Sequence, residues 1–353
     1  MTSPVVVGRL APSPTGVLHL GNARTLLWAW LSARSAQGQV LLRIEDLLPG
    51  AQEHLASVLS DLLWLGLDWD APAPRTEGAV DPGELLPAAA GLPAVVLQSE
   101  RFELYRRVMQ RLTRAGMVYP CICTRKDIEL ASRAPHAEDK GRPYPGTCRG
   151  RFADEGAAIR WEGANALRRG RRPLGCALRL RVPSAPVLFS DRIHGPQATR
   201  LPDDCGDFVL RKKDGDYAYM FSVVVDDLAM GVTEVIRGDD LLDCTAQQVA
   251  VYQAIATHCD AQDLGGADPR SPMPSWTHVP LVLGGDGRRL AKRNRSVHVQ
   301  QLAAEGVSAG RVRRWLARSM GLPDSGDLRD LVAAWPSHRT VSDPVVFVPA
   351  DLA

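Results

Sequence analysis

The sequence predicts an α/β fold built around a parallel sheet, and three features carry that prediction. Two aliphatic runs, 5–7 and 40–44, flank an amphipathic stretch at 22–35, which is the pattern of a βαβ unit. In the second half of the chain, strand candidates alternate with helix candidates, as they do in an α/β sheet. The 353 residues are enough for one large domain with appended modules.

The overall composition narrows the class of protein. A hydrophobic fraction of 45% and a charged fraction of 23% are typical of a globular chain. The first residues, MTSPVVVGRL, lack the features of a signal or transit peptide, and no stretch approaches the length of a membrane span. We therefore expect a cytoplasmic protein without a membrane partner; we also expect a monomer. A net charge of +2 is compatible with an RNA partner but does not predict one.

The middle of the chain differs in composition from both ends. Prolines are dense in 71–97, which predicts a surface insertion, and helical periodicity returns at 101–115. A cysteine-bearing segment and an arginine-rich stretch follow; the run at 168–172 suits a solvated face or phosphate contact equally well. We expect the first half of a catalytic domain at 1–118 and an inserted, acceptor-binding module at 119–206.

The rest of the chain returns to the α/β pattern. The residues predict a strand at 208–211, an apolar run at 218–225, a helix at 245–257 and a strand at 275–283. From these elements we assign the second half of the catalytic domain to 207–296. Residues 297–353 allow two or three helices, with a core-facing stripe formed by Val312, Trp315, Leu316 and Met320.

The first βα turn, GRLAPSPTGVLHLGNART, is the most informative segment. It contains neither a GxGxxG loop nor a Walker motif, so a dinucleotide oxidoreductase and a P-loop ATPase have no motif support. Pro12 stiffens the strand exit, Gly16 permits an unusual backbone turn, and 19–22 lead into a helix. Amides and the positive dipole at that helix start predict an anionic ligand such as a phosphate.

This segment resembles the class I aminoacyl-tRNA synthetases. HLGN at 19–22 is similar to their HIGH motif, and RLAPSPTG before it resembles the glutamyl branch. The resemblance implies a Rossmann-type catalytic domain in which His19 binds ATP phosphates as charge develops, with Pro12, Gly21 and Asn22 in the same ATP site. The ordinary alternative for His19 is packing at a helix end.

A second motif is expected late in the chain, within GDGRRLAKRNRS at 285–296. RLAKR at 289–293 resembles the KMSKS motif, although Arg289, Ala291 and Arg293 depart from it. Lys292 stands where the catalytic lysine belongs and would also contact ATP; an ordinary basic loop is the alternative. Magnesium would arrive with ATP as part of the substrate.

The glutamyl resemblance also implies an amino-acid pocket. Arg9 and Arg237 would bind carboxylates, Glu45 the ammonium group, and Ser13 and Tyr219 would complete the glutamate site. Each has an ordinary alternative: Arg9 could pair with a surface acid, Glu45 could cap a helix and Tyr219 could fill the core.

Cysteine spacing predicts a metal site in the inserted module. Cys121, Cys123 and Cys148 offer three thiolates, with His136 as a candidate fourth ligand and buried free cysteines as the alternative. The C-x-C and Tyr-x3-Cys pattern resembles the glutamyl-Q tRNA(Asp) synthetase family, which implies one structural zinc with Tyr144 as fourth ligand. The remaining cysteines are assigned to packing: Cys176, Cys205, Cys244 and Cys259.

The short segment after Ser296 predicts that an anticodon-reading helical domain is missing. The family resemblance then implies activation of L-glutamate with ATP without tRNA, and transfer of glutamate to queuosine in the anticodon of tRNA(Asp). Two alternatives remain open at this point. One is a truncated glutamyl-tRNA synthetase that charges tRNA(Glu), and the other is a non-catalytic paralogue that binds nucleotide or RNA.

Overall fold

The computed structural model describes residues 5–73, 76–81, 91–124, 126–128, 143–168, 170, 172–287, 290, 297–335, 341–348 and 352. The strands span β1 Val7–Leu10, β2 Gln39–Ile44, β3 Ala79–Val80, β4 Val95–Leu97, β5 Val118–Cys121, β6 Ala177–Leu180, β7 Val187–Asp191, β8 Gly195–Thr199, β9 Val209–Arg211, β10 Glu234–Gly238, β11 Ser275–Val279, β12 Val282–Gly284 and β13 Val345–Phe347. The α-helices span α1 Leu20–Ser35, α2 Leu55–Trp64, α4 Phe102–Arg114, α6 Glu155–Arg168, α7 Leu201–Asp204, α8 Tyr219–Ala229, α9 Thr245–His258, α10 Val299–Ala304, α11 Ala309–Ser319 and α12 Leu328–Ala334. Short 3-10 turns span η1 Ala51–His54, η2 Gln98–Arg101 and η3 Asp239–Leu241.

A parallel sheet runs through the centre of the molecule. β1 pairs with β2, β2 with β4, and β10 with β11, all in parallel. The two groups meet at Thr233, whose N–H donates to the Val7 carbonyl over 2.9 Å and whose hydroxyl accepts from the Val7 N–H over 2.8 Å. The resulting spatial order, β4-β2-β1-β10-β11, confirms the predicted α/β fold.

The opening βαβ unit forms close to its predicted bounds. α1 begins two residues before the predicted helix and ends at Ser35 as expected, and β2 covers the predicted run. β1 begins only at Val7, later than the predicted run at 5–7. Arg24 of α1 donates to the carbonyls of Pro280 and Ser319, over 2.6 and 3.1 Å, which ties this unit to the end of the chain.

Two element predictions were wrong in detail, and one apolar run had no assigned structure. The expected surface insertion at 71–97 ends in β4, a fully buried strand of the central sheet. The strand predicted at 275–283 is two strands, because Pro280 has no N–H to continue the ladder. The apolar run at 218–225, which was assigned to neither a strand nor a helix, lies in helix α8 from Tyr219 onward, and α8 packs Phe221, Val224 and their neighbours into the core.

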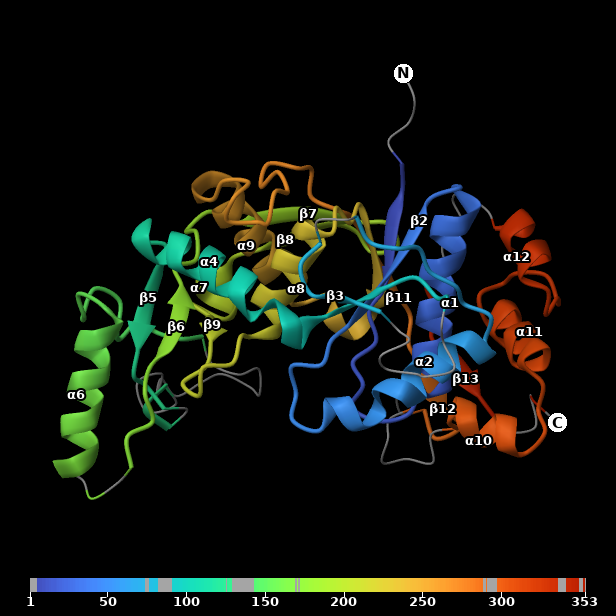
Figure 1. The fold of residues 1–353 in the computed structure, drawn as a ribbon, viewed down its shortest axis with the longest axis horizontal. Coiled ribbons are helices and arrows are strands. Elements are labelled where there is room, and N and C mark those ends of the chain that lie inside the picture. The colour runs from blue at the N-terminus through green and yellow to red at the C-terminus, as the bar shows by residue number, and fades with distance from the viewer. Residues whose placement is uncertain are drawn as a thin grey trace.

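The middle module has its own antiparallel sheet, β5-β6-β9, with α6 beside it at one end of the molecule (Figure 1). Its third strand, β9, comes from beyond the predicted boundary at residue 206. The β7-β8 hairpin lies inside the predicted module but joins β11 of the central sheet instead. The chain therefore enters the module twice, at β5 and again at β9, which a single boundary could not capture.

The C-terminal segment covers α1 on the other side of the molecule (Figure 1). The predicted core stripe is confirmed, because Val312, Trp315, Leu316 and Met320 are all at most 5% exposed. β13 adds a strand beside β12 that was not predicted. Across the described ranges, none of the helices combines the length and apolar character that crossing a bilayer requires.

Candidate active site

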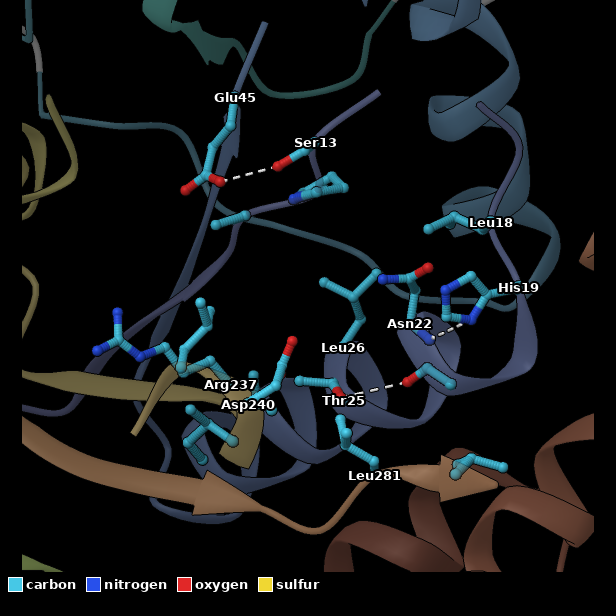
Figure 2. A pocket seen from close by; sticks show the side chains of 18 of the residues that line it. Ser13, Leu18, His19, Asn22, Thr25, Leu26, Glu45, Arg237, Asp240 and Leu281 are labelled. Atoms are coloured by element: carbon cyan, nitrogen blue, oxygen red, sulfur yellow. Dashed lines mark hydrogen bonds between the residues drawn. The ribbon is translucent and has the colours of Figure 1, made fainter. Parts of the chain in front are cut away.

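A cavity of about 530 Å³ opens where β1, β2 and β10 end and α1 begins (Figure 2). This is the edge at which parallel α/β sheets offer a crevice to ligands. The cavity brings together the predicted ATP and glutamate residues that the structure describes: Arg9, Pro12, Ser13, His19, Gly21, Asn22, Glu45, Tyr219 and Arg237. Lys292, the remaining residue of that set, lies outside the described residues.

One end of the cavity is formed by the start of α1. His19 is the residue that caps this helix, and its Nδ1 accepts from the backbone N–H of Asn22 over 3.2 Å. A neutral imidazole that accepts at Nδ1 carries its proton on Nε2. A side chain at position 21 would lie 3.0 Å from the His19 ring, so Gly21 leaves room for this cap. Gly16, with φ of 153°, supplies the unusual turn predicted for it.

Described residues on either side of 291–296 lie at the same end of the cavity. Leu290 lines the cavity, and its N–H donates to the Val282 carbonyl over 3.0 Å. After the undescribed stretch, the Val297 carbonyl accepts from Leu20 over 3.2 Å, and the Val299 N–H donates to Leu18 over 2.9 Å. Leu290 therefore lines the cavity, and Val297 and Val299 lie beside the start of α1.

The other end of the cavity carries buried charged side chains. Arg9 donates to the Ile236 carbonyl over 3.1 Å, and its Nε lies 3.6 Å from the Asp227 carboxylate. Burial lowers the pKa of Arg9 from its usual value, and Asp227 opposes this effect. Asp227 is itself only 4% exposed, so the alternative of a surface ion pair for Arg9 is wrong.

Glu45 follows β2 and faces the same space. Its carboxylate accepts from the Ser13 hydroxyl over 3.0 Å, as Figure 2 shows, and from Arg43 over 3.1 Å. Glu45 caps no helix among the described residues. Tyr219, at the start of α8, lines this end too, and burial raises its pKa to about 12, which keeps the phenol neutral near pH 7.

Arg43 was not singled out from the sequence, yet it organises this end. Its guanidinium is fully buried and contacts Glu45, Asp227 over 2.5 Å and Asp226 over 3.8 Å. Burial alone would lower the pKa of Arg43, but the three carboxylates together raise it. An arginine within VLLRI, the otherwise apolar part of this strand, was the available signal, because a buried charge requires buried partners.

Arg237 lies at the end of β10 and is held from behind by side chains that the sequence did not indicate. Its Nε donates to His278 Nε2 over 2.9 Å, Nη1 donates to Gln248 over 2.8 Å and Nη2 donates to Thr245 over 2.8 Å. His278 in turn lies 2.7 Å from Asp191. These contacts fix the plane of the Arg237 guanidinium at the cavity wall.

The predicted cysteines form a compact cluster in the middle module. The thiol sulfurs of Cys121, Cys123 and Cys148 all lie within 4.8 Å of one another, and those of Cys123 and Cys148 are 3.6 Å apart. The Tyr144 phenol oxygen lies 3.4 Å from Cys121 and 3.8 Å from Cys123. A tetrahedral site with Zn–S bonds of about 2.3 Å has edges of roughly 3.8 Å, so this donor set fits zinc.

The surroundings of Tyr144 suit a ligand that carries negative charge. The Arg179 guanidinium lies over the Tyr144 ring, 3.9 Å from its centroid, and the Cys148 N–H donates to the phenol oxygen over 2.8 Å. Both contacts favour the phenolate, whereas burial and the neighbouring Cys121 thiol raise the pKa of Tyr144. Of the other cysteines, Cys176 and Cys259 are buried, as the packing assignment expects. His136 lies outside the described residues.

The fold and cavity correspond to a known family. The catalytic domain described as "tRNA synthetases class I (E and Q)" matches residues 5–334, so the chain belongs to that family and is an enzyme of the ligase type. A relative from Nitratidesulfovibrio vulgaris named glutamyl-Q tRNA(Asp) synthetase is 44% identical over 91% of this chain and 88% of its own length. A relative of the same name from Symbiobacterium thermophilum is 40% identical over 97% and 95%. These matches place the chain in that branch of the family.

Two further comparisons show how the branch relates to longer enzymes. Glutamate–tRNA ligase 1 of Halorhodospira halophila is 40% identical over 94% of this chain, but only 62% of that ligase is covered. The crystal structure of a glutamate tRNA ligase from Elizabethkingia meningosepticum, in complex with its amino acid, superposes with a TM-score of 0.70 at 23% identity. It covers 99% of this chain and 68% of the ligase, which establishes the shared fold.

Proposed function

We propose that the chain activates L-glutamate with ATP to glutamyl-adenylate and transfers glutamate to queuosine in the anticodon of tRNA(Asp). The observation that carries this proposal is a single cavity with two unlike ends. One end offers a capped helix start, suited to phosphates, and the other offers buried arginines and a carboxylate, suited to an amino acid with two carboxylates.

The activation step joins the two ends of the cavity. An oxygen of the glutamate α-carboxylate attacks the α-phosphorus of ATP, a new P–O bond forms, and pyrophosphate leaves. In this proposal the His19 Nε2–H and the ammonium of Lys292 bind phosphate oxygens as their charge increases. Mg²⁺ enters with ATP and is held mainly by the phosphates. The protein positions the reactants and stabilises charge, and it forms no covalent bond to them.

Glutamate would be held by side chains whose charges complement it. Arg9 and Arg237 bind its carboxylates, Glu45 with Ser13 binds the ammonium group, and Tyr219 completes the pocket. Glutamine would leave a buried guanidinium without its anionic partner, and leaving a buried charge unpaired is costly. The pocket therefore favours the acid over the amide.

The proposed acceptor rests on the relatives rather than on the cavity. Relatives that are 38–44% identical to this chain, over most of their own length, carry the name glutamyl-Q tRNA(Asp) synthetase. In the transfer step, a hydroxyl of the queuosine cyclopentenediol attacks the carbonyl carbon of the adenylate, an ester bond forms and AMP leaves. Charging of tRNA(Glu) is the second candidate, supported by the 40% identity to a glutamate–tRNA ligase.

Two assays test this function. Purified protein should exchange labelled pyrophosphate into ATP with glutamate and without any tRNA. Labelled glutamate should then be transferred to tRNA(Asp) that contains queuosine, and to neither queuosine-free tRNA(Asp) nor tRNA(Glu). Labelling of tRNA(Glu) would select the second candidate, and equal labelling of both forms of tRNA(Asp) would refute queuosine as acceptor.

We also propose that Cys121, Cys123, Tyr144 and Cys148 hold one structural zinc ion. The module elements β5, β6 and α6 lie at the opposite end of the molecule from α1, at whose start the cavity opens (Figure 1). Zinc would therefore stabilise the module without taking part in adenylation. The Cys123→Ser protein should lose most of its zinc and melt at a lower temperature, while glutamate-dependent exchange falls less than about threefold at a temperature where the variant is folded. Zinc analysis by mass spectrometry checks the first result, and full zinc retention would contradict the assignment.

A further inference from the structure

The guanidinium of Arg237 is surrounded on its protein side by neutral groups. Its three hydrogen bonds reach an imidazole nitrogen, an amide oxygen and a hydroxyl oxygen, from His278, Gln248 and Thr245. All four side chains are at most 5% exposed. Among the described residues, no carboxylate lies within ion-pair distance of Arg237.

The carboxylate of Asp191 is separated from Arg237 by the imidazole ring of His278. Asp191 accepts from the His278 side chain over 2.7 Å and from the His278 backbone N–H over 2.9 Å. Its other oxygen accepts from the N–H groups of Ile193 and His194, each over 2.9 Å. Asp191 thus orients the imidazole with its proton on Nδ1, which leaves Nε2 as the acceptor for Arg237.

Arg9, on the neighbouring strand, has the opposite surroundings. Its Nε lies 3.6 Å from Asp227, a carboxylate that it shares with Arg43. The positive charge of Arg9 is therefore partly balanced within the protein. A buried cation without a nearby anion attracts an incoming carboxylate more strongly than a cation that is already paired.

We propose that Thr245, Gln248 and the His278–Asp191 pair are positioning residues that orient Arg237 without neutralising it, and that the absence of a carboxylate beside Arg237 makes the pocket select an acidic amino acid. This inference rests on the proposed function, because it explains how that same pocket would distinguish glutamate from glutamine. None of these four side chains lines the cavity. They act through Arg237 and touch neither the substrate nor the reacting atoms.

Substitutions that add one negative charge behind Arg237 test the proposal. Gln248→Glu keeps the size of the side chain and the acceptor at Nη1. Thr245→Asp adds a carboxylate at Nη2, and a carboxylate is favoured there because residue 245 begins α9. In glutamate-dependent pyrophosphate exchange, each should raise the KM for glutamate about 30-fold or more. The KM for ATP and the kcat at saturating glutamate should change less than about threefold.

The matched control is Thr245→Asn, which has the shape of Thr245→Asp without its charge. It should raise the KM for glutamate less than about fivefold, since neutral hydrogen bonds are weaker than charged ones. The two acidic variants should also lose preference for glutamate over glutamine, whereas Thr245→Asn should retain it. A uniform loss of ATP binding and glutamate binding would point to damaged packing and would overturn the proposal.

The outcomes also separate this inference from the function on which it rests. Exchange by the unmodified protein, combined with equal glutamate KM values for Thr245→Asp and Thr245→Asn, would overturn the inference and leave the function standing. Absence of glutamate-dependent exchange in the unmodified protein would overturn both. The expected pattern is a change confined to the acidic variants and to the glutamate KM.

Discussion

The two ends of the cavity are built from different kinds of chemical group. The amino-acid end consists of side-chain charges buried in the central sheet, with Arg43 contacting three carboxylates. The nucleotide end consists mostly of main chain, with the start of α1 capped by His19 and the segment at 297–299 hydrogen-bonded beside it. The first end is held by ion pairs and the second by backbone geometry.

This difference matches the two tasks proposed for the ends. Selecting a small charged ligand requires side chains that cannot rearrange, and a buried ion network provides that rigidity. Stabilising a charge that grows during reaction requires donors that already point at its final position. Disruption of the amino-acid end should therefore affect stability and glutamate affinity, whereas disruption of the nucleotide end should affect the rate of adenylation.

The largest effect is expected from breaking the ion network at the amino-acid end. Arg43→Met removes the fully buried cation that contacts Glu45, Asp226 and Asp227. Among the described residues, only Arg101, 2.6 Å from Asp226, and Arg9, 3.6 Å from Asp227, then remain to offset these buried carboxylates. Loss of one partner from a buried charge cluster costs about 3–5 kcal/mol. Urea unfolding at pH 7 should show a fall in unfolding free energy of that size.

Arg34→Met is the matched control for this prediction. Arg34 also contacts two carboxylates, Asp68 over 3.0 Å and Asp70 over 2.7 Å, but those carboxylates are 69% and 36% exposed. Pairs of this kind contribute less than about 1 kcal/mol. If both variants lost a similar amount of unfolding free energy, the buried network would contribute no more to stability than the exposed ion pairs of Arg34.

The second largest effect is expected on the rate of adenylation, from a change at the nucleotide end. Lys292→Ala should lower the kcat of adenylation about 100-fold to 1,000-fold, because Lys292 is proposed to bind phosphate oxygens in the transition state. The KM for glutamate should change little, since glutamate binds at the other end of the cavity. Single-turnover kinetics with saturating ATP measures this, and an unchanged rate would remove Lys292 from the proposed mechanism.

Much of the cavity could be predicted because its motifs are local. RLAPSPTG and HLGN place a strand end, a turn and a helix start within a few residues, so the side chains they carry had to lie together. The structure gathers them in one cavity, while their roles stay predictions. The cysteine spacing succeeded for the same reason, because three of the proposed donors lie within 28 residues and form one cluster.

What could not be predicted depends on contacts between distant segments. Asp191 and His278 are separated by 87 positions, and no local pattern links them. Strand β4 was missed because a short apolar run beside prolines looks like a loop until its pairing with β2 is known. The run at 218–225 is too short for periodicity alone to separate a strand from a buried helix.

The smallest effect should come from Asp61, a buried acid at the nucleotide end. Asp61 of α2, 2% exposed, accepts from the Leu18 N–H over 3.3 Å and so supports the turn before His19. Burial raises the pKa of Asp61 to about 6, while the Leu18 N–H lowers it. The folded protein then holds this proton more tightly than the unfolded chain, so stability falls as pH rises from about 4 to about 6. Above that window the charged acid costs at most about 3 kcal/mol.

Asp61→Asn keeps an acceptor for Leu18 and removes this titration. The variant should therefore be more stable than the unmodified protein at pH 7.5, by about 1–2 kcal/mol, and its advantage should shrink towards zero as the pH is lowered to 4.5. Thermal unfolding across that range measures the difference. A variant that is less stable at pH 7.5 would mean that the ionised carboxylate binds the Leu18 amide more strongly than burial opposes it. The nucleotide end would then depend on a buried charge in the same way as the amino-acid end, and the contrast between the two ends would be lost.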